Sequence, residues 1–119
     1  MSVTEKIIGA AIEVHRAIGP GLLESAYQEC MSYELTLLGV PFTRQLPLPV
    51  IYKGVKVDCA YRLDFLVDEV VLEIKSVAGV DPIHIAQVMA YMKLGKWKVG
   101  LLINFNVTSL TRGIRRIVL

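Results

Sequence analysis

The residues best suited to chemistry in this 119-residue sequence lie between Asp64 and Lys75, where two apolar segments flank the pair Asp68-Glu69. If Asp68 and Glu69 form a two-residue turn, Asp64 pairs with Glu73 across two antiparallel strands. Side chains alternate between the two faces of a strand, so Asp64, Glu73 and Lys75 then project from one face. The spacing therefore predicts a shared polar site.

Two carboxylates in this position repel each other unless something compensates their charge. Directly opposed residues have Cβ atoms about 5 Å apart, and two charges at that distance repel by about 3 kcal/mol at an effective dielectric near 20. A divalent cation, a shared proton or the adjacent lysine would offset this repulsion. The alternative is that both carboxylates point to water. The neighbouring residues argue against this alternative, because they form an apolar opposite face that helices must cover: Leu63, Phe65, Leu72 and Ile74.

The shared site depends on the length of the turn. A loop one residue longer would shift the strand pairing and place Asp64 and Glu73 on different faces of the sheet.

Two helices are predicted before these strands. Apolar residues at helical spacing predict the first over 3–18, with Ser2 or Thr4 as its N-cap. Proline and glycine in the stretch 19–21 end this helix, because proline lacks a backbone donor and glycine relaxes the backbone. The second helix is expected from about Leu22 to Leu38, ending at Gly39, a residue suited to a left-handed cap.

The rest of the chain predicts a mixed sheet. Alternating residues predict a strand over 46–52, which is an edge or irregular strand because its two prolines cannot donate to a ladder. Strands over 55–67 and 70–76 complete an antiparallel meander. Asp81 as N-cap and Pro82 as first helical residue predict a helix over 82–94.

The run 97–105 is almost unbroken in its apolar character, which predicts a strand covered on both faces and parallel to 70–76. Residues 113–119 can add a last edge strand. We therefore expect one α/β domain over residues 1–119, with a mixed sheet of four to five strands flanked by helices, in the order ααβββαββ.

Composition limits the class of protein. Hydrophobic residues make up 54% and charged residues 20% of the chain, which is typical of a folded protein. No apolar run reaches the roughly 18 residues needed to span a bilayer, so no membrane partner is expected. The sequence lacks a signal-peptide pattern and a CxxC pair. We therefore expect Cys30 and Cys59 to be reduced and internal, and the protein to be cytoplasmic.

Charge is unevenly distributed along the chain. Seven basic and eleven acidic residues precede Pro82, a net charge of −4, whereas six basic residues and no acidic ones follow, a net charge of +6. Such segregation suits a surface that meets a polyanion beside an acidic pocket. The plainer reading is that these basic residues are solvated ends of secondary-structure elements.

Asp64 followed by Glu73-Ile74-Lys75 resembles the active-site signature of the PD-(D/E)xK nuclease superfamily. One departure is that Leu63 stands where the name-giving proline would be. The resemblance implies a restriction-endonuclease-like core in which Asp64 and Glu73 hold Mg²⁺ or Mn²⁺ and Lys75 positions or activates a water.

Two further motifs narrow the resemblance. Residues 21–27, Gly-Leu-Leu-Glu-Ser-Ala-Tyr, are similar to the signature of the GxxExxY family, a group of small proteins assigned to the same superfamily. Residues 87–91, Gln-Val-Met-Ala-Tyr, resemble the QxxxY motif of its RecB-like branch. The resemblance implies that Glu24 acts at the site as a metal ligand or catalytic residue, directly or through water. It also implies that Gln87 orients Lys75, a water or a phosphate.

Each of these positions has an ordinary structural explanation as well. Glu24 lies in the first turn of its helix, where the helix dipole favours a carboxylate. Tyr27 is expected to pack in the core with its hydroxyl group satisfied. Gln87 can be an exposed amide, with Tyr91 packed beneath it on the same helix face.

The resemblance implies Mg²⁺-dependent hydrolysis of phosphodiester bonds in nucleic acid, with DNA favoured over RNA. The main alternative is a non-catalytic module on the nuclease scaffold that binds nucleic acid or protein. A third is a purely structural homo-oligomer, since the chain is short and rich in apolar residues. So small a chain has little room for a recognition domain, so we expect either weak sequence specificity or specificity supplied by a protein partner or a homodimer.

Overall fold

The computed structural model describes the backbone of all 119 residues and every side chain except those of Cys59 and Ala60. Its elements, in chain order, are α1 (Val3–Ile18), α2 (Glu24–Leu37), β1 (Phe42–Tyr52), β2 (Val55–Val67), β3 (Val70–Lys75), α3 (Pro82–Gly95), β4 (Val99–Asn104), the 3-10 helix η1 (Leu110–Gly113) and β5 (Ile114–Val118). The predicted order of helices and strands is confirmed. The expectation for Cys59 lies outside the described side chains.

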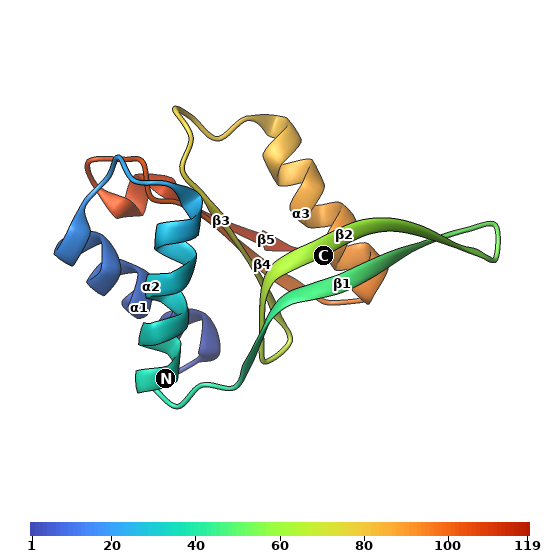
Figure 1. The fold of residues 1–119 in the computed structure, drawn as a ribbon, viewed down its shortest axis with the longest axis horizontal. Helices are drawn as coiled ribbons and strands as arrows, with labels where there is room; N and C mark the ends of the chain where they lie inside the picture. Colours follow the sequence, from blue (N-terminus) through green and yellow to red (C-terminus); the bar gives the residue numbers. More distant parts are fainter.

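The five strands form one mixed sheet in the order β1-β2-β3-β4-β5. The first three are antiparallel, β3 and β4 are parallel, and β5 is antiparallel to β4. Helix α3 provides the crossover between the two parallel strands, as predicted. Helices α1 and α2 lie on one side of the sheet and α3 lies on the other (Figure 1). None of the helices described is both long enough and apolar enough to cross a membrane.

Local sequence signals explain where the two N-terminal helices begin and end. The Ser2 hydroxyl group accepts a hydrogen bond from the backbone N–H of Glu5 (3.2 Å), which caps α1. Gly39 follows α2 with φ of 68°, the left-handed conformation that glycine adopts without strain. Helix α2 starts two residues later than predicted, because Leu23 is extended and serves as the N-cap. Glu24 is therefore the first helical residue.

Strand β1 is an edge strand, and its pairing with β2 shifts register between Leu48 and Val50. Pro49 lies at this shift, which agrees with the predicted irregular edge, since proline cannot donate to the ladder. The strand begins earlier than predicted, at Phe42, so that β1 and β2 form a long hairpin. The tip of this hairpin reaches well beyond the rest of the sheet (Figure 1).

Each face of the sheet supports its own hydrophobic core. One face packs α1 and α2 against strand residues that include Phe65, Leu72 and Ile74. The other packs α3 against residues that include Leu63 and Val71. The prediction that Leu63 and Phe65 lie on the same face of the sheet is wrong.

Alternation is interrupted in the hairpin between Leu63 and Phe65. In β1, Arg44 pairs with Phe65 and Leu46 pairs with Leu63, and the residue between them, Gln45, has a φ of 51°. A residue in this left-handed conformation breaks the regular alternation of a strand. On the side of this irregularity nearer the hairpin tip, Leu63 therefore faces α3.

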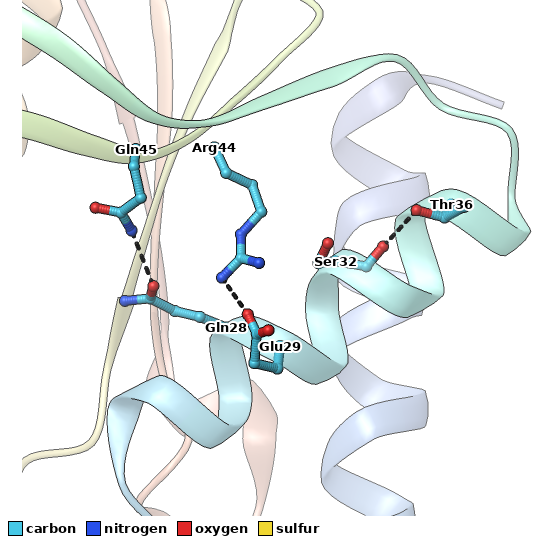
Figure 2. A network of polar contacts seen from close by, with 6 residues as sticks. All are labelled: Gln28, Glu29, Ser32, Thr36, Arg44 and Gln45. Atoms are coloured by element: carbon cyan, nitrogen blue, oxygen red, sulfur yellow. Dashed lines mark hydrogen bonds and ion pairs between the residues drawn. The ribbon is translucent and has the colours of Figure 1, made fainter.

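A small polar network holds this part of β1 against α2 (Figure 2). Arg44 forms an ion pair with Glu29, and its guanidinium group lies 5.4 Å from the centroid of the Phe65 ring. The Gln45 amide donates a hydrogen bond to Gln28 (3.1 Å). The network thus anchors the hairpin next to the break in alternation.

Candidate active site

The turn on which the site depends has two residues, as predicted. Asp68 and Glu69 have φ values of 45° and 57°, which matches the two positive φ values of the type I′ turn that suits tight hairpins. Val67 pairs with Val70 across the turn, and the predicted register continues along β2 and β3. The longer loop that would separate the two acidic residues does not occur.

Asp64 and Glu73 meet where the regular pairing of β2 and β3 ends. The Asp64 backbone N–H donates to Oε2 of Glu73 (3.1 Å), and the Ile74 backbone N–H donates to Oδ2 of Asp64 (2.8 Å). Each carboxyl group therefore accepts a hydrogen bond from the backbone of the opposite strand. The two acidic side chains converge between the strands instead of pointing apart into water.

Burial and mutual contact perturb the acid of β3 strongly. The Glu73 side chain is only 5% exposed. Burial, and then the hydrogen bond to Asp64 and its charge, raise the pKa of Glu73 from 4.5 to about 9, while the positive charge of Lys75 opposes the rise. Without a cation, Glu73 therefore holds a proton at neutral pH. Of the three compensations predicted for the repulsion, the proton therefore dominates when no cation is bound, while the charge of Lys75 favours the ionised form.

Lys75 is the last residue of β3, and its surroundings hold its backbone in place. It pairs with Asn104 of β4, and its carbonyl group accepts a hydrogen bond from the Phe105 N–H (2.9 Å). The Asn104 side chain is 1% exposed and bonds both the N–H and the carbonyl group of Val77, each at 3.0 Å. The segment that leaves the site after Lys75 is thus clamped from both sides.

The sequence interpretation missed Asn104. The signal that would have found it is an amide within the apolar run 97–105, because a buried polar side chain needs hydrogen-bond partners. Its partners could not be named in advance, since they belong to a loop 27 residues away along the chain.

Glu24 begins α2, and the loop before it is tied to the end of β3. The Tyr27 hydroxyl group donates to the Gly19 carbonyl (2.7 Å) and accepts from the Leu22 N–H (3.1 Å). Ser76, directly after Lys75, donates from its hydroxyl group to the Leu22 carbonyl (2.6 Å). Tyr27 is fully buried, so the prediction of a core tyrosine with a satisfied hydroxyl group is confirmed. These bonds hold the start of α2 beside the end of β3.

The structure brings Asp64 and Glu73 together but does not add Glu24 to them. Among the residues described, no three histidine, cysteine, aspartate or glutamate side chains are grouped so that they could hold a metal ion. The role of Glu24 as a ligand therefore stays a prediction that the geometry does not test.

Helix α3 contributes Gln87 and Tyr91 to the same region. Gln87 is exposed, Tyr91 is buried, and the two residues lie one helical turn apart on the same face of α3. Gln87 is therefore an exposed amide and Tyr91 a buried side chain, as the ordinary structural explanation of this motif expects. Burial, and then the nearby charge of Glu73, raise the pKa of the Tyr91 hydroxyl group, so Tyr91 lies close to the acid pair. The hydrogen bonds of the described side chains do not connect Gln87 to Lys75.

The pair Asp64–Glu73 fits a divalent cation by its chemistry. Both groups offer carboxylate oxygens, the ligands that Mg²⁺ and Mn²⁺ prefer. A carboxyl group that holds a proton because burial and a neighbouring carboxyl group raise its pKa can exchange this proton for a cation, because ligands bind metal in the deprotonated form. The donor set therefore suits such an ion.

Comparison with known proteins gave one result. The sequence model of a family described as the PD-(D/E)XK nuclease superfamily matches residues 1–117. No curated protein and no solved structure matched the chain. The family match extends from α1 into β5 and includes every candidate site residue.

Proposed function

Because the chain belongs to the PD-(D/E)XK nuclease superfamily, we propose that it is a metal-dependent nuclease that hydrolyses phosphodiester bonds in nucleic acid, with DNA as the favoured substrate. The observation that carries the proposal is the convergence of the Asp64 and Glu73 carboxyl groups beside Lys75. Superfamily members generally use divalent metals, and the two carboxyl groups favour Mg²⁺ or Mn²⁺ here.

Each residue has a distinct role in this proposal. Asp64 and Glu73 hold the cation, which supplies positive charge that stabilises the negative charge developing on the phosphate. Lys75 orients the attacking water and offsets part of the same charge. Glu24 acts from the start of α2, through a water. Gln87, one helical turn before Tyr91 on α3, positions a water or a phosphate oxygen.

The motif at 21–27 supports a finer assignment to the GxxExxY group of the superfamily. The tyrosine of this motif, Tyr27, forms two hydrogen bonds to the loop that precedes Glu24, and it therefore helps to position the glutamate of the same motif. The cytoplasm is the proposed location. A homodimer or a protein partner is the proposed source of any sequence specificity.

The test is a cleavage assay on single-stranded DNA, duplex DNA and RNA with Mg²⁺, Mn²⁺ or EDTA. Asp64→Asn and Lys75→Ala should each lower the metal-dependent rate by about 100-fold or more. The matched controls are Glu69→Gln and Lys98→Ala, which change exposed charges outside the site and should keep the rate. Cleavage that persists undiminished in Asp64→Asn and Lys75→Ala would contradict the proposal, since the activity would then come from elsewhere.

One observation favours a second function, a non-catalytic module that binds nucleic acid. Within the described part of the chain, no third carboxylate is grouped with Asp64 and Glu73. A module of this kind would bind nucleic acid without cleaving it under any metal condition. Binding would then be insensitive to Asp64→Asn.

A further inference from the structure

A large groove lies next to the acid pair, between α3 and the β1–β2 hairpin. Its volume is about 720 Å³, and its lining is mainly apolar, including Val50, Ile83 and Leu94. This volume falls within the range typical of small-molecule sites. The groove lining also includes Gln87 and Tyr91, and the charge of Glu73 acts on the Tyr91 hydroxyl group, so this wall of the groove lies near the candidate active site.

An exposed aromatic ring belongs to the lining of the groove. Tyr61 of β2 is 45% exposed, although its ring lies against the buried Tyr91, with 6.0 Å between the ring centroids and 54° between the ring planes. The Tyr61 ring thus has one aromatic neighbour, while much of the residue's surface faces solvent. A flat ring of this kind is a stacking surface for another aromatic group.

The charged residues around Tyr61 are mostly basic. Lys93 lines the groove, and no acidic side chain among those described does. Tyr61 also borders a neighbouring hollow of about 410 Å³ that is lined by Lys56, Arg62 and one acid, Asp58. Lys56, Arg62 and Lys93 take part in no ion pair with a described side chain. Their charges are therefore available to a polyanion.

We propose that this groove receives an unpaired nucleobase, which stacks on Tyr61 while Lys93 and Arg62 neutralise the flanking phosphates, so that the substrate is single-stranded or locally unpaired nucleic acid. The proposal rests on the proposed nuclease function and specifies its substrate. Stacking on an aromatic side chain beside basic residues is the usual way to bind single strands without sequence preference.

The shape of the groove favours this occupant over a duplex. The bases of a duplex are stacked and paired inside the helix, and they reach a concave pocket only if they are turned out of it. An unpaired base enters the groove without that cost. Its phosphate then lies near the carboxyl groups of Asp64 and Glu73, since Tyr91 adjoins both the groove and this pair.

The experiment measures binding by fluorescence anisotropy, in EDTA so that no cleavage occurs, with a labelled single-stranded oligonucleotide and its duplex. Tyr61→Ala should weaken binding of the single strand by about 5- to 150-fold and binding of the duplex much less. Tyr61→Phe keeps the ring and should bind as the wild type does. Tyr52→Ala removes another exposed tyrosine, at the hairpin tip and outside the groove lining, and should also have no effect.

A second readout reports stacking itself. An oligonucleotide that carries 2-aminopurine should lose fluorescence on binding to wild type and to Tyr61→Phe, but not to Tyr61→Ala at saturating protein. Far-UV circular dichroism of each variant checks that the fold is intact.

Several results would overturn the inference. If Tyr61→Ala binds the single strand as tightly as wild type while metal-dependent cleavage is present, the groove is not the base site and the nuclease proposal stands. If Tyr61→Ala weakens binding of the single strand and of the duplex equally, Tyr61 contributes to binding of any nucleic acid and does not select unpaired bases. A wild-type dimer that Tyr61→Ala converts to a monomer, with nucleic-acid binding unchanged, would assign the groove to a second copy of the chain. A wild type that neither binds nor cleaves would refute the nuclease proposal as well.

Discussion

Replacing Glu73 by glutamine removes the ionisation of the buried carboxyl group while keeping its shape. The glutamine oxygen can accept the hydrogen bond from the Asp64 N–H, and its NH₂ group can donate to the Asp64 carboxylate, so both contacts of the protonated acid are reproduced. In the wild type, burial and Asp64 raise the pKa of Glu73 from 4.5 to about 9. Between these two pH values the folded state holds a proton that the unfolded chain has released, so the free energy of unfolding falls as pH rises.

The size of the effect follows from the two pKa values of Glu73. Each pH unit above 4.5 lowers the free energy of unfolding by about 1.4 kcal/mol, until the folded state itself ionises near pH 9. By pH 7 this amounts to about 3 kcal/mol, a large share of the stability of a small domain. In Glu73→Gln, residue 73 does not titrate and adds no such pH dependence to the free energy of unfolding. This variant should match the wild type near pH 4 and exceed it by up to about 3 kcal/mol at pH 7.

The assay is urea unfolding of wild type and Glu73→Gln from pH 4 to 9 in EDTA, because other titrating groups cancel in the difference between the two proteins. Glu69→Gln, at the exposed turn, is the matched control and should follow the wild type. Adding Mg²⁺ at pH 8 should stabilise the wild type, since the cation replaces the proton, and should stabilise Glu73→Gln much less. Parallel curves for wild type and Glu73→Gln across this pH range would refute the reasoning.

Two further predictions concern stability. Tyr27→Phe leaves the two backbone groups of the loop before α2 without their hydroxyl partner and should lower the free energy of unfolding by about 1–3 kcal/mol in urea; an unchanged value would show that water replaces the hydroxyl group. Gly113→Ala should lower the free energy of unfolding by about 1–3 kcal/mol, because the new Cβ atom would collide with the Asn104 carbonyl oxygen. Gly9→Ala should instead raise the free energy of unfolding by about 0.5–1 kcal/mol, because Gly9 lies inside α1 and nothing lies within 4 Å of the new Cβ atom. Changes of the same sign at both glycines would contradict the packing described.

Much of the fold could be predicted because its signals are local. The alternation along β2 and β3 and the tight turn between them need only neighbouring residues, and they correctly placed Asp64 opposite Glu73. Proline and glycine marked the breaks between elements, so the helix bounds differ from prediction by about two residues at most. The family match supports the resemblance that Asp64 and the stretch 73–75 had raised.

The exception within this local picture is Leu63. Strand alternation predicts its face only while the backbone stays regular, and the left-handed Gln45 in the neighbouring strand interrupts that regularity. Nothing in the residues next to Leu63 signals the break. The irregular residue lies in β1, which α2 anchors through Arg44 and Glu29.

By itself, the sequence determined which residues approach one another across the turn, because backbone periodicity and turn length are properties of adjacent residues. Tertiary structure decided how these residues behave. The burial that raises the pKa of Glu73, the clamp of Asn104 on the segment after Lys75, and the groove beside Tyr61 all require elements that are distant along the chain. Desolvation and cavity shape depend on everything that packs around a group, so only the folded chain sets them.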